Sequence, residues 1–114
     1  MFAAHHKLTN LVAIIDYNKL QSLTTVDKTL RVEPLIDKLT AFGWRAVELD
    51  GHDHFALIQA LIENNTVDER PLVIVAHTTK GKGVGFMEDK VEWHYKSPDA
   101  IQLKQAIAEI EAAA

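Results

Sequence analysis

The most suggestive residue is Asn18, which stands where an apolar segment gives way to a polar one. Residues 11–15 are apolar, the run stops at Asp16, and Asn18 follows two residues later. The amide oxygen of Asn18 is a hard, neutral ligand of the kind that Mg²⁺ accepts alongside substrate phosphates. The same Asp-Tyr-Asn sequence is also typical of a plain turn, so these residues alone leave a ligand and a turn as alternatives.

Two later segments carry groups that could meet an anion. Residues 78–83 read Thr-Thr-Lys-Gly-Lys-Gly, in which glycines let backbone N–H groups approach a phosphate and Lys80 or Lys82 adds charge. The order is not that of a Walker loop, and a flexible turn is the alternative. His94, between two aromatic residues, could bind an anion or exchange a proton near neutral pH. A packed loop residue is the alternative for this histidine.

Other polar residues have simpler explanations. The segment Asp50-Gly-His-Asp53 could supply metal ligands, but a turn at Gly51 followed by a helix cap at Asp53 explains the same residues. His5 and His6 are adjacent rather than four residues apart, so we interpret them as exposed helix residues and not as a metal pair. The sequence contains neither a Ser-His-Asp signature nor a Gly-x-Gly-x-x-Gly fingerprint.

The composition is that of an ordinary globular domain. The 114 residues are 47% hydrophobic and 25% charged, enough for one small domain over residues 1–114. A net charge of −4 without a Lys/Arg stripe argues against a nucleic-acid partner. No apolar run approaches the roughly 20 residues of a membrane span, so no membrane association is expected. The absence of cysteine excludes disulfides and a cysteine zinc site, and it fits a cytoplasmic location.

Apolar periodicity and punctuating residues predict alternating helices and strands. Strands are expected at 11–16, 44–49 and 72–76. Helices are expected at 2–8, 31–43, 53–65 and from Ser97 as a cap onward. The first strand should be buried on both faces, as in a parallel sheet. The helical residues expected to face the core are Leu35, Ile36, Leu39 and Phe42; Phe55, Ile58, Leu61 and Ile62; and Ile101, Ile107 and Ile110.

These elements predict an α/β fold: a mostly parallel sheet with helices on both faces, in three layers. The connections at 17–31 and 78–96 exceed the roughly 12–15 residues beyond which structureless loops are uncommon and usually functional or disordered. Both leave the carboxyl edge of the sheet, where open α/β folds bind ligands. We therefore expect both loops to border the functional site, which favours the ligand interpretation of Asn18.

Taken together, these segments resemble the thiamine-diphosphate-binding domain of transketolase, in particular the amino-terminal subunit of the form that is split into two chains. The matching motifs occur in family order and cover essentially the whole chain. They are Ile15-Asp-Tyr-Asn-Lys-Leu-Gln21, Phe42-Gly-Trp44, Val47-Glu-Leu-Asp-Gly-His-Asp53, Thr78-Thr-Lys-Gly-Lys-Gly-Val84, Phe86-Met-Glu-Asp89 and Trp93-His94.

The resemblance implies a cofactor, a reaction and a set of site residues. Thiamine diphosphate, held by Mg²⁺ or Ca²⁺, would serve as the electron sink while a two-carbon ketol unit moves from a ketose phosphate to an aldose phosphate. In this family an Asp, an Asn side chain and the carbonyl two residues after that Asn bind the metal, and the last two match Asn18 and Leu20. The family histidine that contacts the diphosphate and the reacting substrate matches His94, which implies cofactor-binding and catalytic roles.

One departure from the family pattern bears on activity. The family's Gly-Asp-Gly segment, with the metal-binding Asp, would precede the helix at 2–8, so the resemblance covers an incomplete thiamine-diphosphate-binding fold. Because the cation would lack this charged protein ligand, we expect the isolated chain to bind the cofactor weakly and to have no turnover. We also expect a homo-oligomer or a complementing transketolase chain, because the sheet would lack an edge strand.

Three further hypotheses stand beside this one. The chain could be a truncated remnant or an assembly module that keeps the fold without the chemistry. It could belong to a related thiamine enzyme, such as the synthase that makes deoxyxylulose phosphate. It could also be an unrelated nucleotide-binding α/β domain in which Asp16 or Asp50 holds a ribose hydroxyl, although the glycine fingerprint is absent.

Overall fold

The chain divides into two compact units. A computed structural model describes residues 1–67 and 69–113. The first unit comprises Met1–Tyr17 and Val32–Thr78, and the second comprises Asn18–Arg31 together with the chain from Thr79 onward. The chain therefore passes from one unit to the other three times, and the two long predicted connections account for most of the second unit.

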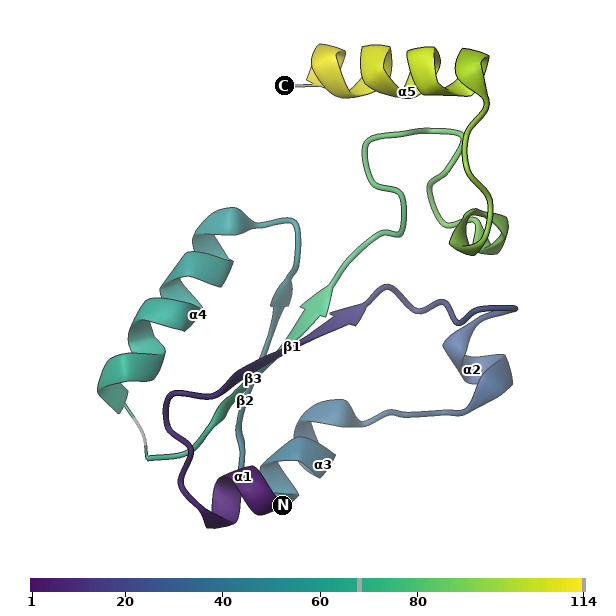
Figure 1. Ribbon diagram of the computed structural model, residues 1–114. Coiled ribbons are helices and arrows are strands. Elements are labelled where there is room, and N and C mark those ends of the chain that lie inside the picture. Colours follow the sequence, from purple (N-terminus) through teal and green to yellow (C-terminus); the bar gives the residue numbers. More distant parts are fainter. Residues whose placement is uncertain (68, 114) are drawn as a thin grey trace. The chain divides into compact units, whose positions relative to one another are not determined.

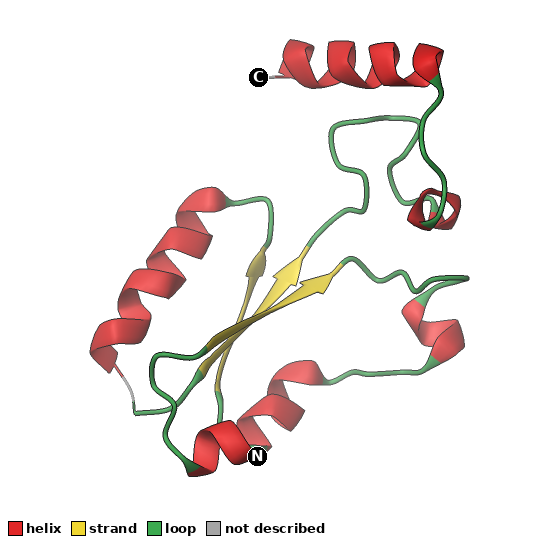
Figure 2. Ribbon diagram, in the orientation of Figure 1, coloured by secondary structure: helices red, strands yellow, loops and turns green. Residues whose placement is uncertain are grey.

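Among the described residues, the first unit forms a three-stranded parallel sheet with the strand order β1-β3-β2. The strands are β1 (Val12–Tyr17), β2 (Arg45–Asp50) and β3 (Leu72–His77). Helix α4 (His54–Val67) lies on one face, while α1 (Phe2–His5) and α3 (Leu35–Ala41) lie on the other (Figures 1 and 2). The predicted three-layer α/β fold with a parallel sheet is confirmed.

Strand β3 forms the centre of this sheet because its sequence is apolar on both faces. Leu72 and Ile74 are completely buried. Together with Ala76 they pack against Ala60 of α4. Since burial of one Leu or Ile side chain contributes roughly 1.5–3 kcal/mol, β3 is the principal stabilising element of the first unit.

Strand β1 differs from the prediction that it is buried on both faces. It lies at an edge of the described sheet and pairs with β3, with Ile14 opposite Ile74 in the register. The Ile14 side chain is nevertheless 55% exposed. The prediction was wrong because a short run of Val and Ile does not distinguish a central strand from an edge strand.

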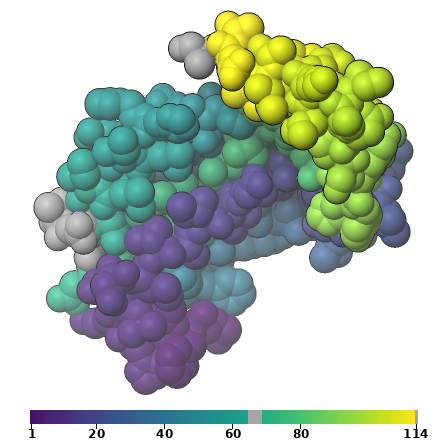
Figure 3. Space-filling view, turned by 45° about the horizontal axis from the view of Figure 1, so that its top comes forward, coloured from purple at the N-terminus to yellow at the C-terminus, as the bar shows by residue number. Residues whose placement is uncertain are grey.

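Helix α4 does not bury the face that its sequence suggested. Leu57 and Ala60 pack on the sheet, whereas other apolar residues of the helix are exposed. The helix lies at the surface in Figure 3 (teal). The exposed residues include all four that were expected in the core, namely Phe55, Ile58, Leu61 and Ile62. That expectation was wrong because α4 has apolar residues on two sides, so periodicity alone does not choose the inward one.

Gly43 ends α3 as predicted. Its φ of +85° is left-handed, and a Cβ atom at this position would lie 2.9 Å from the Cβ of Ala4. Glycine therefore both terminates the helix and lets α1 approach it. The predicted inward residues of α3 are Leu35, Ile36 and Leu39, which are half-buried, and Phe42, which is exposed.

The second unit consists mainly of loops, with α2 (Val26–Thr29), the 3₁₀-helix η1 (Val91–His94) and α5 (Ala100–Ala113). Helix α5 is capped by Asp99, whose Oδ1 accepts hydrogen bonds from the N–H groups of Ile101 and Gln102 at 2.9 Å. The Gln102 side chain accepts the Asp99 N–H at 3.0 Å. The expected Ser97 cap was wrong, because Asp99 with Gln102 three residues later completes a capping box.

Helix α5 also exposes residues that were expected to face inward. Ala106 is its buried residue among those described, whereas Ile101, Ile107 and Ile110 are exposed. The predicted inward face was therefore wrong. Within the described parts of the chain, no helix combines the length and apolar character needed to span a membrane.

Candidate functional site

A pocket in the second unit brings together the residues that the sequence singled out. Its volume is about 110 Å³. Its lining consists of Asn18, Leu20, Gln21, Ser22, Lys80 and His94. The three predicted site residues therefore share one pocket, and Lys80 of the glycine-containing loop joins them. Gln21 and Ser22 were not predicted, because nothing in their sequence context marks them apart from their place beside Leu20.

The Asn18 side of the pocket is a tight turn. The Asn18 Oδ1 accepts a hydrogen bond from the N–H of Leu20 at 3.0 Å. Lys19, between them, has a left-handed φ of +64°, a conformation that costs a non-glycine residue roughly 1–3 kcal/mol and clusters at functional sites. Because an amide oxygen has two lone pairs and Leu20 uses one, the turn and the ligand interpretations of Asn18 are compatible.

The Leu20 carbonyl is oriented by a short antiparallel bridge between Leu20 and Thr25. The hydrogen bonds that close this bridge belong to neighbouring residues, so the N–H and C=O of Leu20 point away from Thr25. The N–H meets Asn18. Since the N–H and C=O of an extended residue point to the same side, Leu20 presents its carbonyl on the side of the Asn18 amide oxygen.

Lys80 is carried by a loop that folds back on itself. Its carbonyl accepts the N–H of Asp89 at 3.0 Å, which closes residues 80–89 into a compact turn. Gly81 has a φ of +72°, and a Cβ atom there would lie 2.8 Å from the Cβ of Met87. Glycine is therefore required at this position both for its conformation and for the close approach of Met87.

The backbone N–H groups of two glycines in this loop are occupied by carboxylates of the chain itself. Gly83 donates to Glu88 at 3.0 Å, and Gly85 donates to Glu109 of α5 at 2.6 Å. Hydrogen bonds from the Gln105 side chain and then from Gly85 lower the pKa of Glu109 below its usual value. The contribution of this loop to an anion site is therefore the Lys80 ammonium group rather than these two N–H groups.

His94 reaches the pocket from the end of η1. Its exposed ring lies edge-on to Tyr95, with 4.6 Å between the ring centres. The preceding residue, Trp93, packs against Phe86 with 5.2 Å between the ring centres. Phe86 and Trp93 thus supply the packing of this segment, and His94 itself is free of that role.

Several other polar residues are engaged in local structure. Asp50 accepts the N–H of His52 at 2.9 Å, and Asp53 accepts the N–H of Ala56 at 3.0 Å, which confirms the predicted turn and helix cap. The Thr78 hydroxyl donates to Asp16. Among the described residues, no group of three or more His, Cys, Asp or Glu side chains is placed to hold a metal ion.

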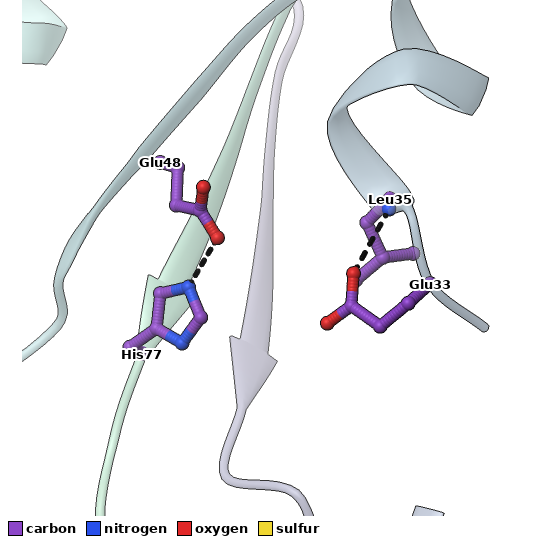
Figure 4. Close-up of polar contacts among 4 residues, drawn as sticks. All are labelled: Glu33, Leu35, Glu48 and His77. Carbon is purple, nitrogen blue, oxygen red and sulfur yellow. Dashed lines mark hydrogen bonds and ion pairs between the residues drawn. The ribbon is translucent and has the colours of Figure 1, made fainter. Parts of the chain in front are cut away.

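The first unit holds a polar cluster that the sequence did not single out. The Nε2 atom of His77 on β3 lies 2.5 Å from a carboxylate oxygen of Glu48 on β2 (Figure 4). The Tyr17 ring lies edge-on to His77 at 5.4 Å. Glu33 accepts the N–H of Leu35 at 3.2 Å (Figure 4), and its pKa is lowered first by the Tyr17 side chain and then by Leu35. These contacts tie the ends of the three strands to the start of α3.

Comparisons with known proteins identify the family of this chain. Residues 1–109 match the family model described as the thiamine diphosphate binding domain of transketolase. The chain is 38% identical to an apulose-4-phosphate transketolase subunit of Phocaeicola vulgatus, over 96% of this chain and 39% of that protein. It is 36% identical to a 6-deoxy-6-sulfo-D-fructose transketolase subunit of a Clostridium species, over 97% of this chain and 40% of that protein.

The fold shows the same relationship. The crystal structure of transketolase from Campylobacter jejuni superposes with a TM-score of 0.88 at 26% identity, covering 96% of this chain and 17% of that one. The chain spans about two-fifths of the length of the two transketolase subunits from Phocaeicola vulgatus and Clostridium. These matches confirm the resemblance and rule out the alternative of an unrelated nucleotide-binding domain. The chain belongs to the transketolase family, and its residues 1–109 match the thiamine diphosphate binding domain of that family.

Proposed function

We propose that this chain holds the metal-bound diphosphate end of thiamine diphosphate in an enzyme that transfers a two-carbon ketol unit from a ketose phosphate to an aldose phosphate. The observation that carries the proposal is the pocket shared by Asn18, Leu20, Lys80 and His94. It occurs in a chain whose family binds thiamine diphosphate. Relatives named for sugar phosphates and related sugars support this substrate class.

The pocket fits one end of the cofactor. Its volume of about 110 Å³ is well below the roughly 300–1,000 Å³ of pockets that enclose a drug-sized ligand. The amide oxygen of Asn18 and the carbonyl of Leu20 are hard oxygen donors suited to Mg²⁺ or Ca²⁺. Lys80 and His94 supply hydrogen-bond donors for a diphosphate, and Lys80 adds a positive charge.

Four of the lining residues divide the work between the cation, the phosphate charge and the proton. Thiamine diphosphate, when bound, supplies the electron sink for breaking and making the carbon–carbon bond. Asn18 and Leu20 orient the cation, while Lys80 offsets phosphate charge in a chain whose net charge is −4. His94 donates a hydrogen bond to the diphosphate and exchanges a proton with a substrate hydroxyl at its exposed imidazole.

The pocket lining leaves one kind of metal ligand to residues outside it. None of its six lining residues is a carboxylate, and two neutral oxygens leave Mg²⁺ without a charged protein ligand beside the diphosphate. We therefore propose that the isolated chain binds the cofactor weakly and does not turn over. The partner that we propose is a complementing transketolase chain, because the relatives are named as transketolase subunits.

The test is calorimetry with thiamine diphosphate and Mg²⁺, using the chain alone and the chain co-expressed with a candidate amino-terminal segment and a carboxy-terminal subunit. In the complex, Lys80→Met and His94→Asn should each weaken binding roughly 10- to 100-fold, the range for a hydrogen bond to a charged group. Two-carbon transfer should fall in parallel.

Matched controls are Lys82→Met, in the same loop but outside the pocket lining, and His54→Asn, at the start of α4. Both should bind as the unmodified complex does. Equal losses in Lys80→Met and Lys82→Met would contradict the pocket assignment. Micromolar affinity of the isolated chain would show that the site needs no partner.

A further inference from the structure

We propose that Trp93 is a positioning residue that clamps η1 onto the loop of residues 80–89 and thereby sets the placement of His94 relative to Lys80. The inference deepens the proposed function, because it concerns the same pocket and rests on the role proposed there. It assigns no contact with the cofactor or substrate to Trp93 itself. Three contacts of one indole ring support this positioning role.

The indole ring of Trp93 makes three contacts with neighbouring residues. Its Nε1–H donates to the carbonyl of Phe86 at 3.0 Å. The Phe86 ring packs against it at 5.2 Å between centres, tilted by 59°. The Lys96 ammonium group lies 4.6 Å from the centre of the indole ring, within the range of a cation–π interaction. A ring restrained in these three ways has little freedom to rotate or slide.

Phe86, the anchor of this ring, is itself tied to Lys80. The hydrogen bond from Asp89 to the Lys80 carbonyl closes the loop that contains both residues. Met87, next to Phe86, packs so closely on Gly81 that a side chain at Gly81 would collide with it. The position of the Phe86 carbonyl is therefore coupled to the position of Lys80.

His94 follows Trp93 directly within η1. A 3₁₀-helix has three residues per turn, so neighbouring side chains diverge by about 120°. With the Trp93 ring directed onto the loop, the His94 ring points to a different side, where it is exposed and lines the pocket with Lys80. Any rotation of Trp93 about the helix axis would move His94 by a comparable angle.

Two substitutions separate the hydrogen bond from the ring packing. Trp93→Phe keeps an aromatic ring and removes the N–H donor, whereas Trp93→Leu removes the ring contacts as well. Amide hydrogen exchange at residues 91–94 should rise about two- to tenfold in Trp93→Phe, the factor expected for one neutral hydrogen bond. It should rise further in Trp93→Leu. The matched control is Trp44→Phe in the first unit, which should leave exchange at 91–94 unchanged.

A second measurement distinguishes positioning from general stability. Millimolar pyrophosphate with Mg²⁺ is titrated into the co-expressed complex, in which this chain alone is labelled, while the imidazole C–H signals of His94 are followed by NMR. In both Trp93 variants, the pyrophosphate affinity read from the His94 signals should fall. The factor should be about the same as the factor by which amide exchange at residues 91–94 rises. Ala106→Gly, which loosens α5 by helix propensity, should lower the melting temperature without this loss.

The outcomes separate the two proposals. Unchanged exchange at 91–94 in Trp93→Leu, or an equal loss of the His94 response in Ala106→Gly, would overturn the positioning role. An unmodified complex in which the His94 signals do not respond to pyrophosphate would instead count against the proposed function. In that case the exchange comparison between the Trp93 and Trp44 variants still decides whether Trp93 holds η1.

Discussion

The two units of this chain are held together by different forces. In the first unit, the central strand β3 is buried along almost its whole length, and ladder hydrogen bonds join it to both neighbours. In the second unit, most restraints are local: hydrogen bonds across tight turns, glycines with positive φ, and the Asp99 cap. All residues that line the pocket belong to this second unit.

The difference shows how stability and chemistry are divided along the sequence. A buried strand stabilises the fold in proportion to the apolar area that it removes from water. Its contribution to the free energy of unfolding is therefore large, and small displacements of its side chains change it little. In a loop held by single hydrogen bonds, each bond adds little to the free energy of unfolding, but each one fixes the position of a particular residue. Changes in the first unit should therefore unfold the protein, whereas changes in the second should disturb the pocket first.

The largest expected effect tests the central strand. Ile74→Ala removes a completely buried side chain and should lower the free energy of unfolding by about 2–5 kcal/mol, because it leaves a cavity as well as losing burial. Ile14→Ala is the matched control, since Ile14 is the register partner on β1 and is 55% exposed. It should cost less than about 1 kcal/mol. Denaturant titration measures both, and similar losses would contradict the central role of β3.

The next effect concerns the loop that carries Lys80. Gly83→Ala should cost about 1–2 kcal/mol from left-handed backbone alone, because a Cβ there meets nothing within 4 Å. Gly81→Ala should cost more, since its Cβ would also collide with Met87 at 2.8 Å. In both variants, amide hydrogen exchange should become faster at residues 80–89, while the amides of the sheet remain protected. A larger effect at Gly83 than at Gly81 would show that the close approach of Met87 is unimportant.

A smaller effect distinguishes the two candidate caps of α5. Asp99→Ala should cost about 0.5–2 kcal/mol, because it removes the acceptor for two N–H groups of the first turn. Ser97→Ala is the control and should change stability by no more than the measurement error. Circular dichroism at the helix band and exchange at residues 101–104 report the loss. A loss of stability in Ser97→Ala but not in Asp99→Ala would show that Ser97 is the cap, as the sequence had predicted.

The smallest effect is a pH dependence in the first unit. The Tyr17 side chain lowers the pKa of Glu33 in the folded state. The associated stability is complete above the usual glutamate pKa of about 4.3, and it is lost as the pH falls through the lowered folded value. Tyr17→Phe should therefore reduce the loss of stability at acidic pH.

The control for this prediction is Tyr95→Phe, an exposed tyrosine of the second unit. It should leave the acid limb of the stability curve unchanged. NMR titration of the Glu33 carboxyl group measures the same link directly. An unaltered pKa of Glu33 in Tyr17→Phe would show that the hydrogen bond from the Tyr17 side chain does not lower that pKa.

Much of the site was accessible from the sequence because its signals are local. Asn18 follows an apolar strand directly, and His94 stands in a Trp-His motif, so both could be named without knowing the fold. Lys80 was marked by its neighbouring glycines. Gln21 and Ser22 carried no such mark, and the occupation of the Gly85 N–H by Glu109 links residues 24 positions apart, which no local pattern reveals.

The sequence by itself determined the family, the order of helices and strands, and the residue types available for cation and phosphate binding. These properties depend on neighbours along the chain. Tertiary structure alone decided that β3 rather than β1 is central and which sides of α4 and α5 are exposed. It also decided that Asn18, Leu20, Lys80 and His94 share a pocket. The physical reason is that burial and convergence arise from contacts between distant segments, which compete for the same apolar and polar partners.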